Sequence, residues 1–131
     1  MGLADALLAQ CQQWQTSTSV VCDCEVDPLP DTLSDYLCVT IYRLVQEGLT
    51  NVARHANATR VIVKLLVSES GELLLSIQDN GRGTPLNDAS QKGFGVLGMQ
   101  ERVASVKGEF NWHSKENQGV HIRIKLPMEF E

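Results

Sequence analysis

Residues suited to metal binding, proton transfer and phosphate binding recur in one amphipathic stretch of the sequence, from Tyr42 to Ala56. At about 100° per residue in a helix, Glu47, Asn51 and Arg54 fall within roughly 60° of one another, beside the apolar face. An asparagine oxygen suits Mg²⁺, a glutamate can orient or deprotonate a nucleophile, and Arg54 with His55 can contact phosphate oxygens. A solvated helix face with an i,i+4 pair would have the same spacing, so periodicity leaves both interpretations open.

Asp79 ends a predicted strand on the same side as Ile77, because side chains alternate along a strand. That side is expected to face the core, where an unpaired carboxylate is costly. Gly81 and Gly83 follow it and allow a close approach of the backbone, which would suit a planar ligand that bears an amino group. A turn in which the carboxylate caps backbone amides fits the residues equally well.

A second glycine-rich run opens a predicted helix further along the chain and comprises Lys92, Gly93, Gly95, Val96, Leu97 and Gly98. Backbone amides in such a loop can face an anion, and the start of a helix adds partial positive charge. The run is neither a Walker A motif nor a dinucleotide-binding fingerprint. Its value lies in the order of the motifs: polar helix, aspartate and glycines at a strand end, glycine loop, helix.

Hydrophobic periodicity predicts the elements that position these residues. Helices are expected over residues 3–14, from a cap at Asp31 or Ser34 to about Ala56, and over 96–106; strands are expected over 19–26, 60–67, 73–78, 109–113 and 120–126. We therefore expect an α+β fold: a two-layer α/β sandwich with a mixed, mostly antiparallel sheet of about five strands, covered on one face by three helices. The strand order does not follow from the pattern.

Composition fits one globular domain over residues 1–131. Hydrophobic residues make up 43% and charged residues 21%, and no run of about 18 apolar residues offers a membrane span. The formal charge of -5 argues against a general nucleic-acid role. The cysteine spacing matches neither a zinc site nor a disulfide framework, so reduced thiols are expected at Cys11, Cys22, Cys24 and Cys38.

The order of motifs resembles the ATP-binding domain of two-component sensor histidine kinases, which has the Bergerat-type fold. That domain shares an ATPase superfamily with DNA gyrase, mismatch-repair MutL and an ATP-dependent chaperone. The subtype resembles the nitrate-sensor and sugar-phosphate-sensor kinases. The resemblance covers residues 2–127 and rests on three runs, residues 43–56, 79–83 and 93–102.

The resemblance implies ATP and Mg²⁺ as cofactors. By residue, it implies that Asn51 coordinates the Mg²⁺ that bridges the phosphates, and that Glu47 is the polar or basic catalytic residue. It implies that Arg54 and His55 lie against the phosphates. It also implies that Asp79 accepts a hydrogen bond from the adenine amino group.

The glycines have implied roles as well. Gly81 and Gly83 would give room to the base. Residues 82–95 would form an ATP lid, closed by Lys92 and by backbone amides at Gly93, Gly95, Val96, Leu97 and Gly98.

Two features depart from the family pattern. Val120 occupies the position of a threonine whose hydroxyl helps to hold a water beside the adenine-binding aspartate. The chain also lacks the helical hairpin with an acceptor histidine, since His113 and His121 lie on predicted strands. We therefore expect the catalytic fragment of a longer kinase, which binds ATP and does not phosphorylate itself alone.

The expected partners are a phosphoacceptor histidine domain of the same kinase and the receiver domain of a response regulator. Nucleic acid and membrane contact by this fragment are not expected, and a cytoplasmic location follows, with the parent kinase anchored in the inner membrane. Two alternatives remain: a stand-alone serine kinase of the anti-sigma-factor type, and a non-catalytic, nucleotide-dependent interaction module.

Overall fold

A computed structural model describes residues 2–82, 96–115 and 117–131, apart from the side chains of residues 55 and 56. The elements in chain order are α1 (Leu3–Thr18), β1 (Val21–Val26), α2 (Asp35–Asn51), the π-helix η1 (Val52–Ala56), β2 (Arg60–Val67), β3 (Leu73–Asp79), α3 (Val96–Ser105), β4 (Glu109–Lys115) and β5 (Gly119–Leu126). Each predicted helix and strand is present near its expected bounds. The first helix runs about one turn longer than expected and ends at Ser19, which adopts the left-handed conformation.

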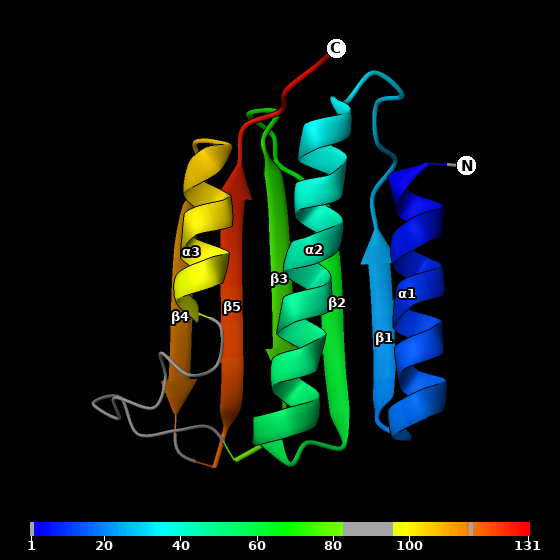
Figure 1. Ribbon diagram of the computed structural model, residues 1–131, viewed down its shortest axis with the longest axis vertical. Helices are drawn as coiled ribbons and strands as arrows, with labels where there is room; N and C mark the ends of the chain where they lie inside the picture. The colour runs from blue at the N-terminus through cyan, green and yellow to red at the C-terminus, as the bar shows by residue number, and fades with distance from the viewer. Residues whose placement is uncertain (1, 83–95, 116) are drawn as a thin grey trace.

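The strands form one mixed sheet in the order β1-β2-β3-β5-β4. β1 pairs with β2 in parallel, and the other three pairings are antiparallel. The helices α1, α2 and α3 cover one face of the sheet, as Figure 1 shows, and none of the described helices lies on the opposite face. The predicted α+β sandwich is confirmed.

The core lies between the sheet and the helices. Alternation along β3 buries every second side chain, and the same holds for the inner positions of β2 and β5. The apolar stripe of α2 covers these strands and contributes Leu37, Ile41, Leu44, Val45 and Leu49. The hydrophobic stripe read from the sequence is therefore the buried face of the helix.

The start of α2 is fixed by Ser34, the predicted capping residue. The Ser34 hydroxyl accepts a hydrogen bond from the backbone N–H of Leu37 and donates one to Glu129 near the C-terminus. A side-chain oxygen at this position satisfies a helix amide that otherwise lacks a partner. The long helix thus begins at a defined residue, and its far end reaches the predicted polar motif.

The far end of this helix differs from the prediction. The α-helix ends at Asn51, and residues Val52–Ala56 continue as a π-helix that stops at Asn57, where φ is 50°. The wider i→i+5 turn rotates each residue by less than the 100° assumed for an α-helix. The expected extent to Ala56 is right, but the assumption of one uniform α-helix is wrong.

The four cysteines form no disulfide with one another. All four are free thiols, and in the part of the chain that the structure describes no three His, Cys, Asp or Glu side chains are grouped so as to hold a metal ion. Cys22 and Cys24 lie on the core side of β1, as the alternation predicted. Over the same residues, no helix has the length and apolar character needed to cross a membrane.

Candidate nucleotide-binding site

Asp79, the last residue of β3, is a buried carboxylate with 6% of its surface exposed. Its Oδ1 accepts a hydrogen bond of 2.8 Å from the Gly81 N–H and a longer one of 3.4 Å from the Val120 N–H. Among the described residues, no hydrogen bond is made to Oδ2. The carboxylate therefore caps backbone amides with one oxygen, which confirms the turn interpretation, and the other oxygen is available to accept a further hydrogen bond. The ligand interpretation stays a prediction.

Burial raises the pKa of the Asp79 carboxyl, and the two backbone hydrogen bonds partly oppose that shift. Desolvation disfavours the charged form of any carboxyl group. An ionised Asp79 is thus a cost to the folded state, and a hydrogen-bond donor from a ligand lowers that cost. The buried Asp79 carboxylate therefore does not stabilise the fold through its charge.

Gly119 closes the other side of this carboxylate. It opens β5 with φ at +82°, a conformation that L side chains rarely adopt. A Cβ here would overlap the carbonyl oxygen of Asp79 and lie 2.9 Å from its Oδ1. The list of site residues predicted from the sequence omitted Gly119, although its place just before Val120 was a usable signal.

Asn80 is a second residue that sequence reasoning missed as part of the site. Its Oδ1 accepts hydrogen bonds of 3.0 Å from the backbone N–H groups of Thr59 and Arg60, and its Nδ2 donates to the Thr59 hydroxyl. These bonds tie the end of β3 to the chain that leaves η1. The residue next to Asp79 therefore holds the strand end and the helix end in register.

Gly48 sets how closely α2 approaches β3. A Cβ at Gly48 would lie 2.6 Å from Cδ1 of Ile77, two residues before Asp79. The absence of a side chain therefore lets the helix backbone lie against the strand at this point. As Figure 1 shows, α2 and β3 both end at the lower edge of the sheet in that view, where β5 begins.

Two residues of the polar stripe of α2 flank this contact. Glu47 directly precedes Gly48, and Asn51 follows it by about one helical turn. Glu47 and Asn51 are half-buried, whereas Arg54 is exposed. The Asn51 Nδ2 atom is buried and has no hydrogen-bond partner among the residues described. Because η1 begins at Val52, Arg54 is rotated away from the other two side chains, so the edge shared by all three residues in the prediction is confirmed only for the first two.

Of the remaining predicted site residues, some lie in the described part of the chain and others lie outside it. Gly81 is buried and bonded to Asp79, whereas the side chain of His55 and all of Gly83, Lys92, Gly93 and Gly95 lie outside the described residues. Val96, Leu97 and Gly98 form the first turn of α3, as expected, and their backbone amides lack intrahelical acceptors. Leu97 is 59% exposed at this helix start.

Val120 is half-buried and packs against the core beside Asp79, as the alternation of β5 predicted. Its backbone N–H bonds to Asp79 whatever the side chain is. The replacement of threonine by valine thus leaves the direct contact with the aspartate in place and removes only a side-chain hydroxyl.

Comparison with known proteins identifies the family. The model of the histidine kinase-, DNA gyrase B- and HSP90-like ATPases matches residues 38–130, which include most of α2 and all of β3 and β5. The chain belongs to this ATPase family. The resemblance inferred from the sequence motifs is confirmed.

Curated relatives of this ATPase domain include a histidine-protein kinase and a sensor protein. The histidine-protein kinase/phosphatase DegS of Brevibacillus brevis is 30% identical over 131 residues, which is 100% of this chain and 34% of DegS. The sensor protein VraS of Staphylococcus saprophyticus is 33% identical over 119 residues, 91% of this chain and 33% of VraS. The chain spans about a third of the length of these relatives.

Solved structures confirm the fold of the ATPase domain. The blue-light-activated histidine kinase of Erythrobacter litoralis EL346 matches 98% of this chain and 42% of its own with a TM-score of 0.84 at 20% identity. The ATP-binding domain of PrrB from Mycobacterium tuberculosis matches 98% of this chain and 96% of its own with a TM-score of 0.75 at 19% identity.

The contact between Gly119 and Asp79 predicts a specific cost of adding a methyl group. Gly119→Ala should lower the free energy of unfolding by about 1–3 kcal/mol more than Gly71→Ala, because only the first Cβ meets other atoms. Gly71 is a matched control: its φ is +85° and nothing lies within 4 Å of its Cβ position. Urea unfolding of both variants measures the difference, and equal losses would show that Gly119 does not constrain Asp79.

Proposed function

We propose that this ATPase domain binds Mg-ATP at the end of the sheet where α2 and β3 terminate, and supplies the γ-phosphoryl group to a histidine on a separate helical domain. The buried Asp79 carboxylate, with one oxygen bonded to backbone amides and the other without a partner in the described residues, carries the proposal. The family match and the sensor-kinase relatives support it.

Asp79 recognises the adenine base. An ionised carboxylate only accepts hydrogen bonds, and the adenine amino group is a donor. The amides of Gly81 and Val120 hold the carboxylate in one orientation, so little side-chain freedom is lost when the base binds. Guanine and hypoxanthine present a carbonyl oxygen in place of that amino group, so the aspartate selects against them.

Asn51 holds Mg²⁺ through its side-chain oxygen. Mg²⁺ prefers oxygen ligands, and it keeps several waters when it is bound with substrate phosphates. The half-buried Asn51 amide fits this role, because neither its oxygen nor its nitrogen is hydrogen-bonded to the described part of the chain, so the oxygen is free to bind a metal ion. Bound Mg²⁺ offsets the negative charge of the phosphates.

Glu47 orients the incoming nucleophile. It lies four residues before Asn51 on the same edge of α2, and it makes no ion pair with the described residues. An imidazole N–H is a donor that a carboxylate can accept, which leaves the other ring nitrogen free to attack. Phosphoryl transfer depends chiefly on such positioning and on charge neutralisation. Arg54 and His55, both within η1, are the proposed phosphate contacts.

The proposal implies partners outside the described fold. A phosphoacceptor histidine domain receives the phosphoryl group and the receiver domain of a response regulator accepts it next, so the reaction takes place in the cytoplasm where ATP is available. The alternatives of a serine kinase or a non-catalytic module have less support, because the curated relatives described above are named as histidine or sensor kinases.

The aspartate predicts nucleotide selectivity. Calorimetric titration in Mg²⁺ should give saturable binding of ATP at least about tenfold tighter than of inosine triphosphate, since the latter leaves a buried acceptor facing a second acceptor. Asp79→Asn should lose that preference, because its amide presents a donor as well as an acceptor. Absence of saturable ATP binding by the unmodified chain, or an unchanged preference in the variant, would contradict the proposal.

The free energy of unfolding of Asp79→Asn shows whether this variant keeps the folded structure. A raised pKa means that the folded state binds more protons than the unfolded state, so the contribution of Asp79 to stability is lost as the pH rises through its folded pKa. Asp79→Asn lacks this loss, and its stability at pH 7 should equal or exceed that of the unmodified chain. The advantage should disappear below about pH 4, where the aspartate is protonated in both states.

Asn51 predicts how magnesium affects affinity. The unmodified chain should bind ATP more tightly in Mg²⁺ than in EDTA, and Asn51→Ala should lose most of this difference while keeping its metal-free affinity, because the contact at Asp79 remains. Gln46→Ala, an exposed position on the same helix, is the control. An undiminished magnesium effect in Asn51→Ala would remove Asn51 as the metal ligand.

A further inference from the structure

The face of the sheet opposite the helices carries a shallow hollow of about 620 Å³. Its lining comes from β2, β3, β4 and β5. This face lies on the other side of the sheet from the α2 stripe, so it takes no part in the proposed nucleotide site (Figure 1). Its composition is unusual for a chain with a net charge of -5, because cations predominate in the hollow.

The floor of the hollow is one row of side chains across the sheet. Ser76 lies in the middle, with Lys64 opposite it on β2 and Arg123 opposite it on β5. Since adjacent strands lie about 4.8 Å apart, the two cations flank the Ser76 hydroxyl from Cα positions about 10 Å apart. The Ser76 hydroxyl is also 2.8 Å from Nε2 of His121, which fixes its place in the row.

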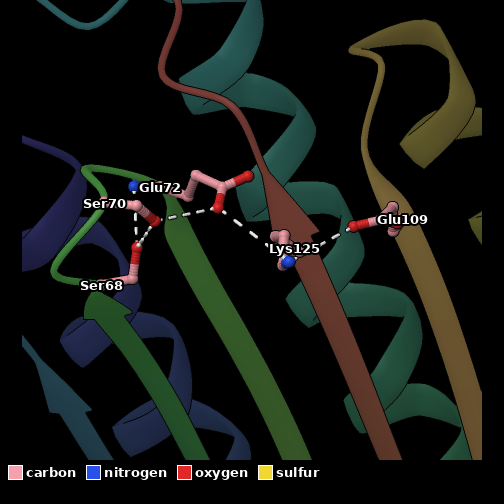
Figure 2. Close-up of polar contacts among 5 residues, drawn as sticks. All are labelled: Ser68, Ser70, Glu72, Glu109 and Lys125. Carbon is pink, nitrogen blue, oxygen red and sulfur yellow. Dashed lines mark hydrogen bonds and ion pairs between the residues drawn. The ribbon is translucent and has the colours of Figure 1, made fainter.

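The two central cations form no ion pair with the described residues, whereas the neighbouring Lys125 forms two. Figure 2 shows Lys125 between Glu72 and Glu109, with N–O separations of 4.0 and 3.5 Å. Within the described residues, neither Lys64 nor Arg123 forms an ion pair. Lys64 has the carboxylate of Glu25 opposite it on β1, whereas Arg123 has the uncharged Asn111 opposite it on β4. The positive charge in the row is therefore compensated least at Arg123.

The positive charge near the hollow affects the pKa of His121. Its pKa is lowered by burial and by the positive charge of Arg123 and the proximity of His113. At the opposite end of the hollow, Leu66 and Leu74 face each other across β2 and β3, and Leu74 is 36% exposed. Lys125 lies beside Leu74 on β5. The hollow thus presents a cationic part next to an apolar part.

We propose that this hollow binds an acidic segment of a partner protein, with a carboxylate between Lys64 and Arg123 and an adjacent apolar side chain against Leu74. The two cations and the Ser76 hydroxyl are donors that match carboxylate oxygens. A nucleic acid fits less well, because the chain as a whole is acidic and a polyanion meets its repulsion over a larger area.

The test uses a fluorescein-labelled hexapeptide of alternating glutamate and leucine, followed by fluorescence anisotropy. We expect saturable binding that weakens as salt rises. Arg123→Gln and Lys64→Gln should each weaken it about fivefold or more, and Arg123→Lys should retain most of it. Lys107→Gln removes the same charge from the turn between α3 and β4 and should leave binding unchanged. Amide resonances of Ser76 and His121 should shift on titration.

Other outcomes overturn the proposal. These are absence of saturable binding, equal weakening by Lys107→Gln, or equally tight binding of a single-stranded oligonucleotide of similar charge. Self-association that is detected by sedimentation velocity and lost in Arg123→Gln would assign the hollow to a second copy of the chain. Failure here is distinguishable from failure of the nucleotide proposal, because Asp79→Asn should bind the peptide normally and Arg123→Gln should bind ATP normally.

Discussion

The buried carboxylate of Asp79 is the constraint on which the arrangement of this domain depends. A carboxylate at the end of a central strand is costly to bury, and only two backbone amides from Gly81 and Val120 offset that cost in the described residues. Their geometry in turn requires that Gly119 have no side chain and a positive φ. The conformation at the end of β3 therefore depends on the hydrogen bonds that the Asp79 carboxylate accepts.

The approach of α2 to the sheet completes the site from the other side. Contact between Gly48 and Ile77 brings the helix backbone close to β3 just before Asp79. That contact lies between Glu47 and Asn51 in sequence, so the residues proposed for catalysis and for metal binding are held beside the strand end. Packing of the core and positioning of the site thus depend on the same few atoms.

Much of this structure follows from local sequence patterns. Alternation predicted that Asp79 points toward the helices, and the 3.6-residue period identified the buried face of α2, because both depend on a regular repeat. The π-helix after Asn51 was not predicted, since an apolar residue at Val52 suits an α-helix and a π-helix equally well. Hydrophobic periodicity did not predict how distant segments align with one another.

Features that depend on contacts between distant segments do not follow from local sequence patterns. The parallel pairing of β1 with β2 and the order β1-β2-β3-β5-β4 bring together residues from separate parts of the chain. The restriction at Gly119 depends on the backbone of Asp79, 40 residues earlier in the numbering. The cationic row on the open face likewise exists only because β2, β3 and β5 are neighbours.

A crystal structure of the chain with Mg²⁺ and a non-hydrolysable ATP analogue tests the central claim most directly. The account predicts the adenine amino group within hydrogen-bonding distance of the Asp79 carboxylate, and the metal ion bound to the side-chain oxygen of Asn51. A nucleotide bound elsewhere, or a base in this site that leaves Asp79 without contact, would contradict it.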